Sequence, residues 1–109
     1  MDRRIELVIA QLEADTSRAW DARTLGGLVH LSASRFRHLF KQETGTSAGQ
    51  YLRELRFRKA ETMLRTTFLS VKEIADEVGL VSLSHFMKEF KKRYGMTTRE
   101  YRVTSKRKH

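Results

Sequence analysis

The sequence contains no cysteine, no proline and no long apolar run. Without cysteine it can form neither a disulfide framework nor a thiolate metal site, which fits a reducing compartment. No apolar stretch approaches the roughly 20 residues that a membrane-spanning helix requires. The amino terminus, MDRRIELVIAQLEAD, carries acidic residues inside its apolar pattern, unlike a signal peptide. We therefore expect a soluble, cytoplasmic protein with no membrane partner.

Acidic residues are scarce in most of the chain. Lys and Arg number 22 against 13 Asp and Glu, a net charge of +9. Residues 1 to 30 hold four Arg and five acidic residues, whereas residues 31 to 109 hold 18 basic and eight acidic residues. Such an imbalance indicates a polyanionic partner, usually nucleic acid. An anionic membrane or an acidic protein would also suit a basic surface.

Apolar residues recur at spacings of three and four, and the alternation typical of strands is missing. This pattern predicts an all-α protein of seven helices. The expected helices cover about residues 3 to 14, 21 to 29, 32 to 43, 47 to 66, 70 to 78, 82 to 94, and a short segment from 97. Serine caps are expected to open four helices and glycines to end three, at Ser32, Ser47, Ser70, Ser82, Gly45, Gly79 and Gly95.

The chain contains an internal repeat. FRHLFKQETGTS, residues 36 to 47, recurs as FMKEFKKRYGMT, residues 86 to 97. The offset is 49 before the turn and 50 after it, because Val81 is one extra residue. Two short helices joined by a tight turn, the second Ser-capped and basic, are typical of a DNA-binding helix-turn-helix. We predict two such subdomains, 1–46 and 67–103, joined by a long linker helix, 47–66, and followed by a basic tail, 104–109.

The core residues of the two repeated helices decide which side chains face outward. Phe36 and Phe40 in the first, and Phe86 and Phe90 in the second, recur at helical spacing and are expected to point inward. The predicted DNA-contacting residues are Ser34, Arg35, Arg37, His38 and Lys41 in the first, Leu83, Ser84, His85, Lys88 and Lys91 in the second, and Arg56 on the linker helix. Arginine can bind guanine bidentately, and the other polar side chains can reach phosphates or base edges.

Three positions on or near the second helix are less regular. Leu83 and Met87 would contact thymine methyl groups or would pack under Val81, and both readings stay open. Lys92 is expected off the outer face. Glu89 occupies the place of buried Leu39, and we expect it at a core edge beside a Lys or Arg.

The first repeat has two unusual features. Gly26 and Gly27 lie inside a helix, where each costs about 1 kcal/mol relative to Ala. Gly26 is expected to allow close packing. His30 stands where the second repeat has Gly79, and a left-handed conformation there would be costly for histidine.

Catalysis and metal binding are not expected. His30, His38, His85 and His109 show no ligand spacing, and no zinc motif occurs. The serines at helix starts are explained by capping. We predict no enzyme activity and no cofactor.

The segment SVKEIADEVGLVSLSHFMKEFKKRYGMTTREYR, residues 70 to 102, resembles the signature of AraC/XylS-type bacterial transcription regulators. YLRELRFRKAETMLR, residues 51 to 65, is similar to that family's linker helix. The sequence departs at Ala48 and Thr98, where the family often has proline, and at His30, where it usually has glycine. The resemblance implies binding to double-stranded promoter DNA and activation through RNA polymerase. It assigns base reading to Ser34, Arg37, His38, Leu83, Ser84, His85 and Lys88.

We interpret the chain as a monomeric, sequence-specific regulator. A linker helix of about 19 residues is about 28 Å long, which suits two recognition helices in adjacent major grooves, about 34 Å apart. The alternative is a basic helical protein-interaction module that docks on an acidic partner such as RNA polymerase. A non-specific architectural DNA binder is a third possibility. The sequence leaves open whether the chain is a short complete regulator or a carboxy-terminal domain.

Overall fold

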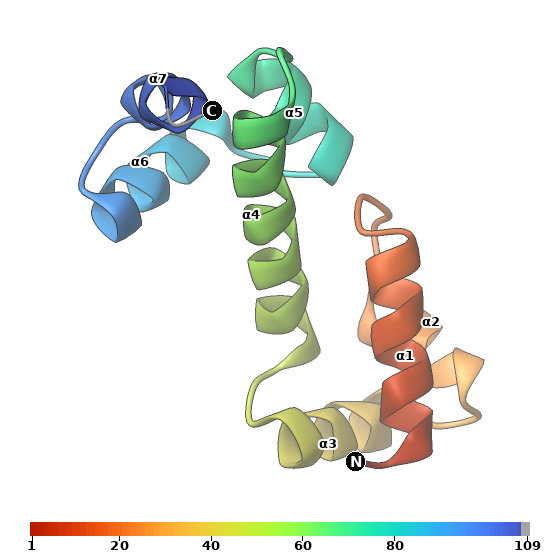
Figure 1. Ribbon diagram of the computed structural model, residues 1–109. Helices are drawn as coiled ribbons and strands as arrows, with labels where there is room; N and C mark the ends of the chain where they lie inside the picture. The colour runs from red at the N-terminus through yellow and green to blue at the C-terminus, as the bar shows by residue number, and fades with distance from the viewer. Residues whose placement is uncertain (108–109) are drawn as a thin grey trace. The chain divides into compact units, whose positions relative to one another are not determined.

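The computed structural model describes residues 1–107, which form seven α-helices and no strand. The helices are α1 (Arg3–Ala14), α2 (Ala22–Leu28), α3 (Ala33–Thr44), α4 (Ala48–Thr66), α5 (Val71–Val78), α6 (Leu83–Tyr94) and α7 (Thr98–Arg107) (Figure 1). The predicted all-α class and helix order are confirmed. Among the described residues no helix combines the length and the apolar character needed to cross a membrane.

The chain divides into two compact units, Met1–Leu55 and Arg56 onward. The division falls inside α4, which is drawn as one unbroken helix in Figure 1. The amino-terminal part of α4 thus belongs to the first unit and its carboxy-terminal part to the second.

The core of the first unit is built from α1, α2, α3 and the start of α4. Its buried members are Ile5, Val8, Leu12, Leu25, Phe36, Phe40 and Leu52. The Phe40 ring lies 5.6 Å from the Phe36 ring and meets Tyr51 edge-on at 5.5 Å, measured between centroids. Aromatic pairs at these separations add to the free energy of burial. They hold α3 with its phenylalanine side against α4.

The second unit repeats this arrangement around α6. Its buried core consists of Phe57, Ala60, Leu64, Ile74, Val78, Phe86 and Phe90. Phe57 from α4 packs on Phe86 and Phe90, with centroids 5.3 and 5.9 Å away. The inward orientation predicted for both phenylalanine pairs is therefore confirmed.

Helix α7 closes the second unit over the end of α4. Arg102 Nε donates to the Leu64 carbonyl at 3.0 Å, and Lys106 Nζ donates to the Thr67 carbonyl at 3.3 Å. These carbonyls belong to the last turn of α4 and the residue after it, where no helical donor follows and where cations are favourable. The Tyr101 hydroxyl donates to Glu61, and burial raises the pKa of Tyr101 to about 12.

The prediction of a basic tail over residues 104–109 is wrong for residues 104 to 107, which are helical. Residues 104 to 107 continue α7, and Lys106 also lies over the Phe68 ring, with Nζ 3.4 Å from its centroid. The reason is that Lys106 has partners at the Thr67 carbonyl and the Phe68 ring, just after α4. Lys108 and His109 lie outside the described residues.

Side-chain caps open the helices as predicted. The hydroxyl of Ser32 accepts from Arg35 N, that of Ser82 from His85 N, and that of Ser47 from Gln50 N, each at 3.2 Å. Ser70 and Glu73 form the reciprocal capping box. The Asp21 carboxylate accepts from Thr24 N, and this bond holds the pKa of Asp21 below its usual value.

The two helix-turn-helix turns have the same backbone hydrogen bonds. Leu31 N donates to Gly26 O at 2.9 Å, and Leu80 N donates to Ala75 O at 2.8 Å. His30 has φ +61° and Gly79 has φ +83°, so both occupy the left-handed region. The turn therefore requires a left-handed residue, and His30 adopts it at an energetic cost that glycine avoids.

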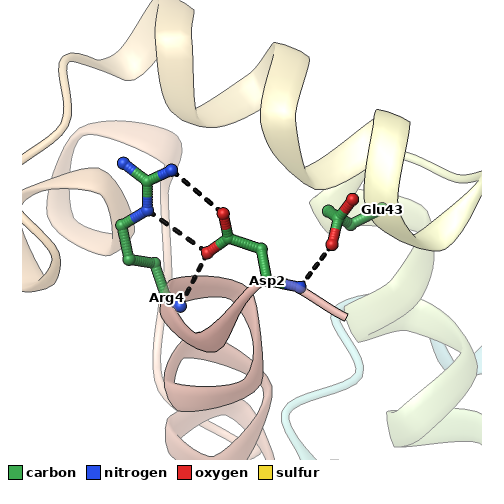
Figure 2. A network of polar contacts seen from close by, with 3 residues as sticks. All are labelled: Asp2, Arg4 and Glu43. Atoms are coloured by element: carbon green, nitrogen blue, oxygen red, sulfur yellow. Dashed lines mark hydrogen bonds and ion pairs between the residues drawn. The ribbon is translucent and has the colours of Figure 1, made fainter.

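A polar network ties the start of α1 to the end of α3 (Figure 2). The Asp2 carboxylate caps α1 by accepting from Arg4 N at 2.8 Å and pairs with the Arg4 guanidinium at 3.0 Å. The hydrogen bond from Arg4 lowers the pKa of Asp2. The Asp2 backbone N–H donates to the Glu43 carboxylate. The hydrogen bond from Asp2 to Glu43 thus attaches the last turn of α3 to the start of α1.

The two neighbouring glycines of α2 are expected to respond oppositely to alanine. A Cβ at Gly26 would lie 2.7 Å from the Leu31 carbonyl oxygen, whereas one at Gly27 would meet nothing within 4 Å. Gly26→Ala should destabilise the first unit by about 1–3 kcal/mol. Gly27→Ala should stabilise it by up to about 1 kcal/mol. Urea unfolding followed by the fluorescence of the single tryptophan, Trp20, which packs on this core, measures both; equal effects would contradict the close packing at Gly26.

Candidate nucleic-acid interface

Helix α3 has one buried side and one polar, exposed side. Phe36 and Phe40 are fully buried, and the residues predicted to contact DNA are all exposed: Ser34, Arg35, Arg37, His38 and Lys41. Three of these five side chains are permanently cationic and the other two can donate or accept hydrogen bonds. The face is therefore suited to both phosphates and base edges.

Helix α6 has the same length, the same Ser cap and the same glycine end as α3. Ser84, His85, Lys88 and Lys91 are exposed, and Leu83 is partly buried. Met87 is 43% exposed and Val81, in the turn, is 99% exposed. Because Val81 covers nothing, the reading in which Leu83 and Met87 pack under it is wrong.

A shallow hollow of about 470 Å³ lies between α6 and the start of α7. It is lined by Met87, Lys88, Lys91, Lys92, Thr97 and Thr98. Lys92 thus shares a surface with Lys88 and Lys91, which corrects the expectation that it lies off the face. The signal was present in the sequence, since Lys88 and Lys92 are four residues apart and so lie on one side of a helix.

Two charged residues stand apart from these faces. Arg56, on α4, is half-buried, and burial lowers its pKa. Because Arg56 lies on α4, it is not part of the exposed face of α3 or of α6. Glu89 is partly buried and pairs with Arg93 at 3.2 Å, as predicted for a core-edge position.

No group of three or more histidine and acidic side chains within residues 1–107 is arranged to hold a metal ion. The hydroxyls of four serines at helix starts accept hydrogen bonds from backbone N–H groups: Ser32, Ser47, Ser70 and Ser82. Capping therefore accounts for their positions.

Comparison with protein families matches residues 25–104 to a helix-turn-helix domain. Among curated proteins, the chain is similar to the RCS-specific HTH-type transcriptional activator RclR of Escherichia coli. The two are 35% identical over 99 residues, which cover 91% of this chain and 35% of RclR. The chain thus spans about a third of the length of such relatives.

Two solved structures share the fold. The carboxy-terminal domain of the two-component response regulator YesN from Fusobacterium nucleatum is 31% identical, with a TM-score of 0.78 over 93% of this chain and 99% of that one. An AraC-type DNA-binding transcriptional regulator from Chromobacterium violaceum is 26% identical, with a TM-score of 0.82 over 94% and 91% of the two chains. The repeated helix-turn-helix and its connecting helix are therefore a known arrangement.

Arg37 provides the test of the α3 face. Arg37→Ala should weaken binding to the preferred DNA site by about 1–3 kcal/mol and relax the preference at one or two base pairs, because a bidentate guanine contact is lost. Arg3→Ala removes the same charge from an exposed position on α1 and should leave base preference unchanged. Binding selections with both variants measure this. If Arg37→Ala keeps the wild-type preference, the assignment of this face is wrong.

Proposed function

The chain belongs to the AraC/XylS-type family of DNA-binding transcription regulators, and we propose that it reads one asymmetric promoter site as a monomer. The observation that carries this proposal is the duplication of one recognition unit. Each unit presents a Ser-capped helix of 12 residues, held by two buried phenylalanines, with a basic outer face. Two such helices in one chain can contact two half-sites without a second copy.

Electrostatic docking is the first step of the proposed mechanism. Lys91 and Lys92 of α6 line the hollow beside α7, and Lys41 lies in the last turn of α3. Ammonium groups in these places would bind phosphates on either side of the groove that receives each helix. Such contacts position the protein on DNA but carry no sequence information.

Base reading is proposed for the amino-terminal halves of α3 and α6. Ser34, Arg37 and His38 would contact one half-site, and Ser84, His85 and Lys88 the other. The exposed α3 face carries no aromatic or large apolar anchor, whereas protein-docking surfaces depend on such anchors. This composition favours DNA over the alternative of a protein-interaction module.

Helix α4 supports the placement in adjacent grooves. It has 19 residues, which at 1.5 Å each make about 28 Å. Leu52 belongs to the first core, and Phe57, Ala60 and Leu64 belong to the second. A helix that contributes residues to both cores is proposed to act as the connection between the two recognition helices, in place of a flexible tether.

We further propose that the protein works in the bacterial cytoplasm and activates transcription through RNA polymerase. The description of RclR as a transcriptional activator supports this role. Contact with the polymerase is inferred from the family resemblance alone.

Salt dependence tests the docking step. About six phosphate contacts predict that log affinity falls linearly with log salt concentration, with a slope of about −5. Lys91→Ala should make the slope shallower by about 1. Lys72→Ala removes an exposed lysine of α5 outside the hollow and should change the slope less. A flat response of the wild-type protein would overturn the DNA-binding proposal.

Half-site spacing tests the role of α4. Selection from random DNA should yield a non-palindromic site of about 20 base pairs that binds one chain. Inserting five base pairs between its halves moves one half-site to the opposite face of the duplex, and affinity should fall to that of a single unit. Titrations with stoichiometry measure this. Tolerance of the insertion, or a two-fold symmetric site occupied by two chains, would contradict the proposal.

A further inference from the structure

The outer faces of α3 and α6 differ at one decisive position. Both helices have 12 residues and begin after a serine cap, so Met87 on α6 stands at the fifth helical position, as Arg37 does on α3. Leu83 occupies the first position of α6, where α3 has Ala33. An apolar side chain therefore replaces the cation that is proposed to read guanine.

These apolar side chains are not needed for the core. Phe86 and Phe90 fill the core side of α6 and are 2% and 0% exposed. Met87 is one turn beyond Leu83, so the two share a stripe beside the buried one. Val81 precedes the helix and is almost fully exposed. Leu83 and Met87 thus lie on one side of α6, and Val81 is an exposed apolar residue just before the helix. We call these three residues the apolar patch, and it is proposed to enter the groove.

The patch lies beside the cations that would hold phosphates. Met87 lines the same hollow as Lys91 and Lys92. A protein surface flanked by phosphate-binding lysines faces the groove between the two DNA strands. In the major groove the one apolar group among the four standard bases is the 5-methyl of thymine.

We propose that Val81, Leu83 and Met87 read thymine methyl groups, so that the half-site bound by α6 is recognised by apolar contact, whereas α3 uses hydrogen bonds. This inference rests on the proposed function, because it presumes that α6 lies in the major groove. It also implies sensitivity to cytosine methylation. A 5-methylcytosine presents its methyl at the same ring position as thymine, and should partly replace it.

Replacement of thymine by deoxyuridine tests the inference, because it removes the methyl and keeps the base pair. The half-site of α6 is first identified as the one whose preference survives Arg37→Ala. Within it, deoxyuridine should weaken wild-type binding about fourfold for each methyl contacted, the effect of burying one such group. Deoxyuridine in the α3 half-site is the DNA control and should have a smaller effect.

Variants at the exposed members of the patch show which side chains are responsible. Val81→Ala and Met87→Ala should bind thymine and deoxyuridine sites equally at the affected position. Val103→Ala shortens an exposed apolar side chain of α7 outside the patch and should keep the fourfold difference. Met87→Arg should exchange the preference for thymine for one for guanine. Thermal unfolding of each variant establishes that it is folded.

The outcomes separate the inference from the proposed function. Two outcomes overturn only the further inference and leave the proposed function standing. One is sequence-selective binding with no deoxyuridine effect in the α6 half-site. The other is a deoxyuridine effect that persists unchanged in Val81→Ala and Met87→Ala. Binding without any sequence preference overturns the proposed function and this inference together. A deoxyuridine effect that disappears in Val81→Ala and Met87→Ala supports the inference.

Discussion

A pair of phenylalanines four residues apart decides what each recognition helix can do. Phe36 and Phe40, like Phe86 and Phe90, are buried on one side of a helix of 12 residues. Since 3.6 residues complete a turn, burying this pair leaves a fixed set of positions facing outward. The outer face is thus a consequence of core packing, and its chemistry can change without altering the fold.

The ends of the helices follow from local chemistry, and this is why the sequence predicts them well. A serine hydroxyl can satisfy a backbone N–H of the first turn, and a left-handed residue ends a helix most cheaply as glycine. Both signals act within a few residues. Even the irregular His30 obeys them, because the repeated turn demands a positive φ whichever residue stands there.

What the sequence could not predict depends on contacts between distant segments. The helical state of residues 104 to 107 requires the carbonyls at the end of α4, which Arg102 and Lys106 reach from about 40 residues away along the chain. Periodicity within one helix cannot reveal such partners. Lys92 differs, because its spacing of four from Lys88 already indicates a shared helix side, and only the wall formed by Thr97 and Thr98 comes from outside α6. The outward exposure of the residues proposed as the α3 site, by contrast, could be predicted from the spacing of Phe36 and Phe40 alone.

The two helix-turn-helix units share one fold, but the outer faces of α3 and α6 carry different side chains, and this difference bears on the symmetry of the DNA site. A symmetric operator offers the same base edges to both halves and suits two identical faces. Here one face offers Arg37 and the other offers Met87 at the same helical position. If, as proposed, Arg37 reads guanine and Met87 reads thymine, no palindrome would give both helices their best contacts. On this proposal a single chain with two unlike faces would fix its own orientation on DNA, whereas two copies of one face would need a further partner to do so.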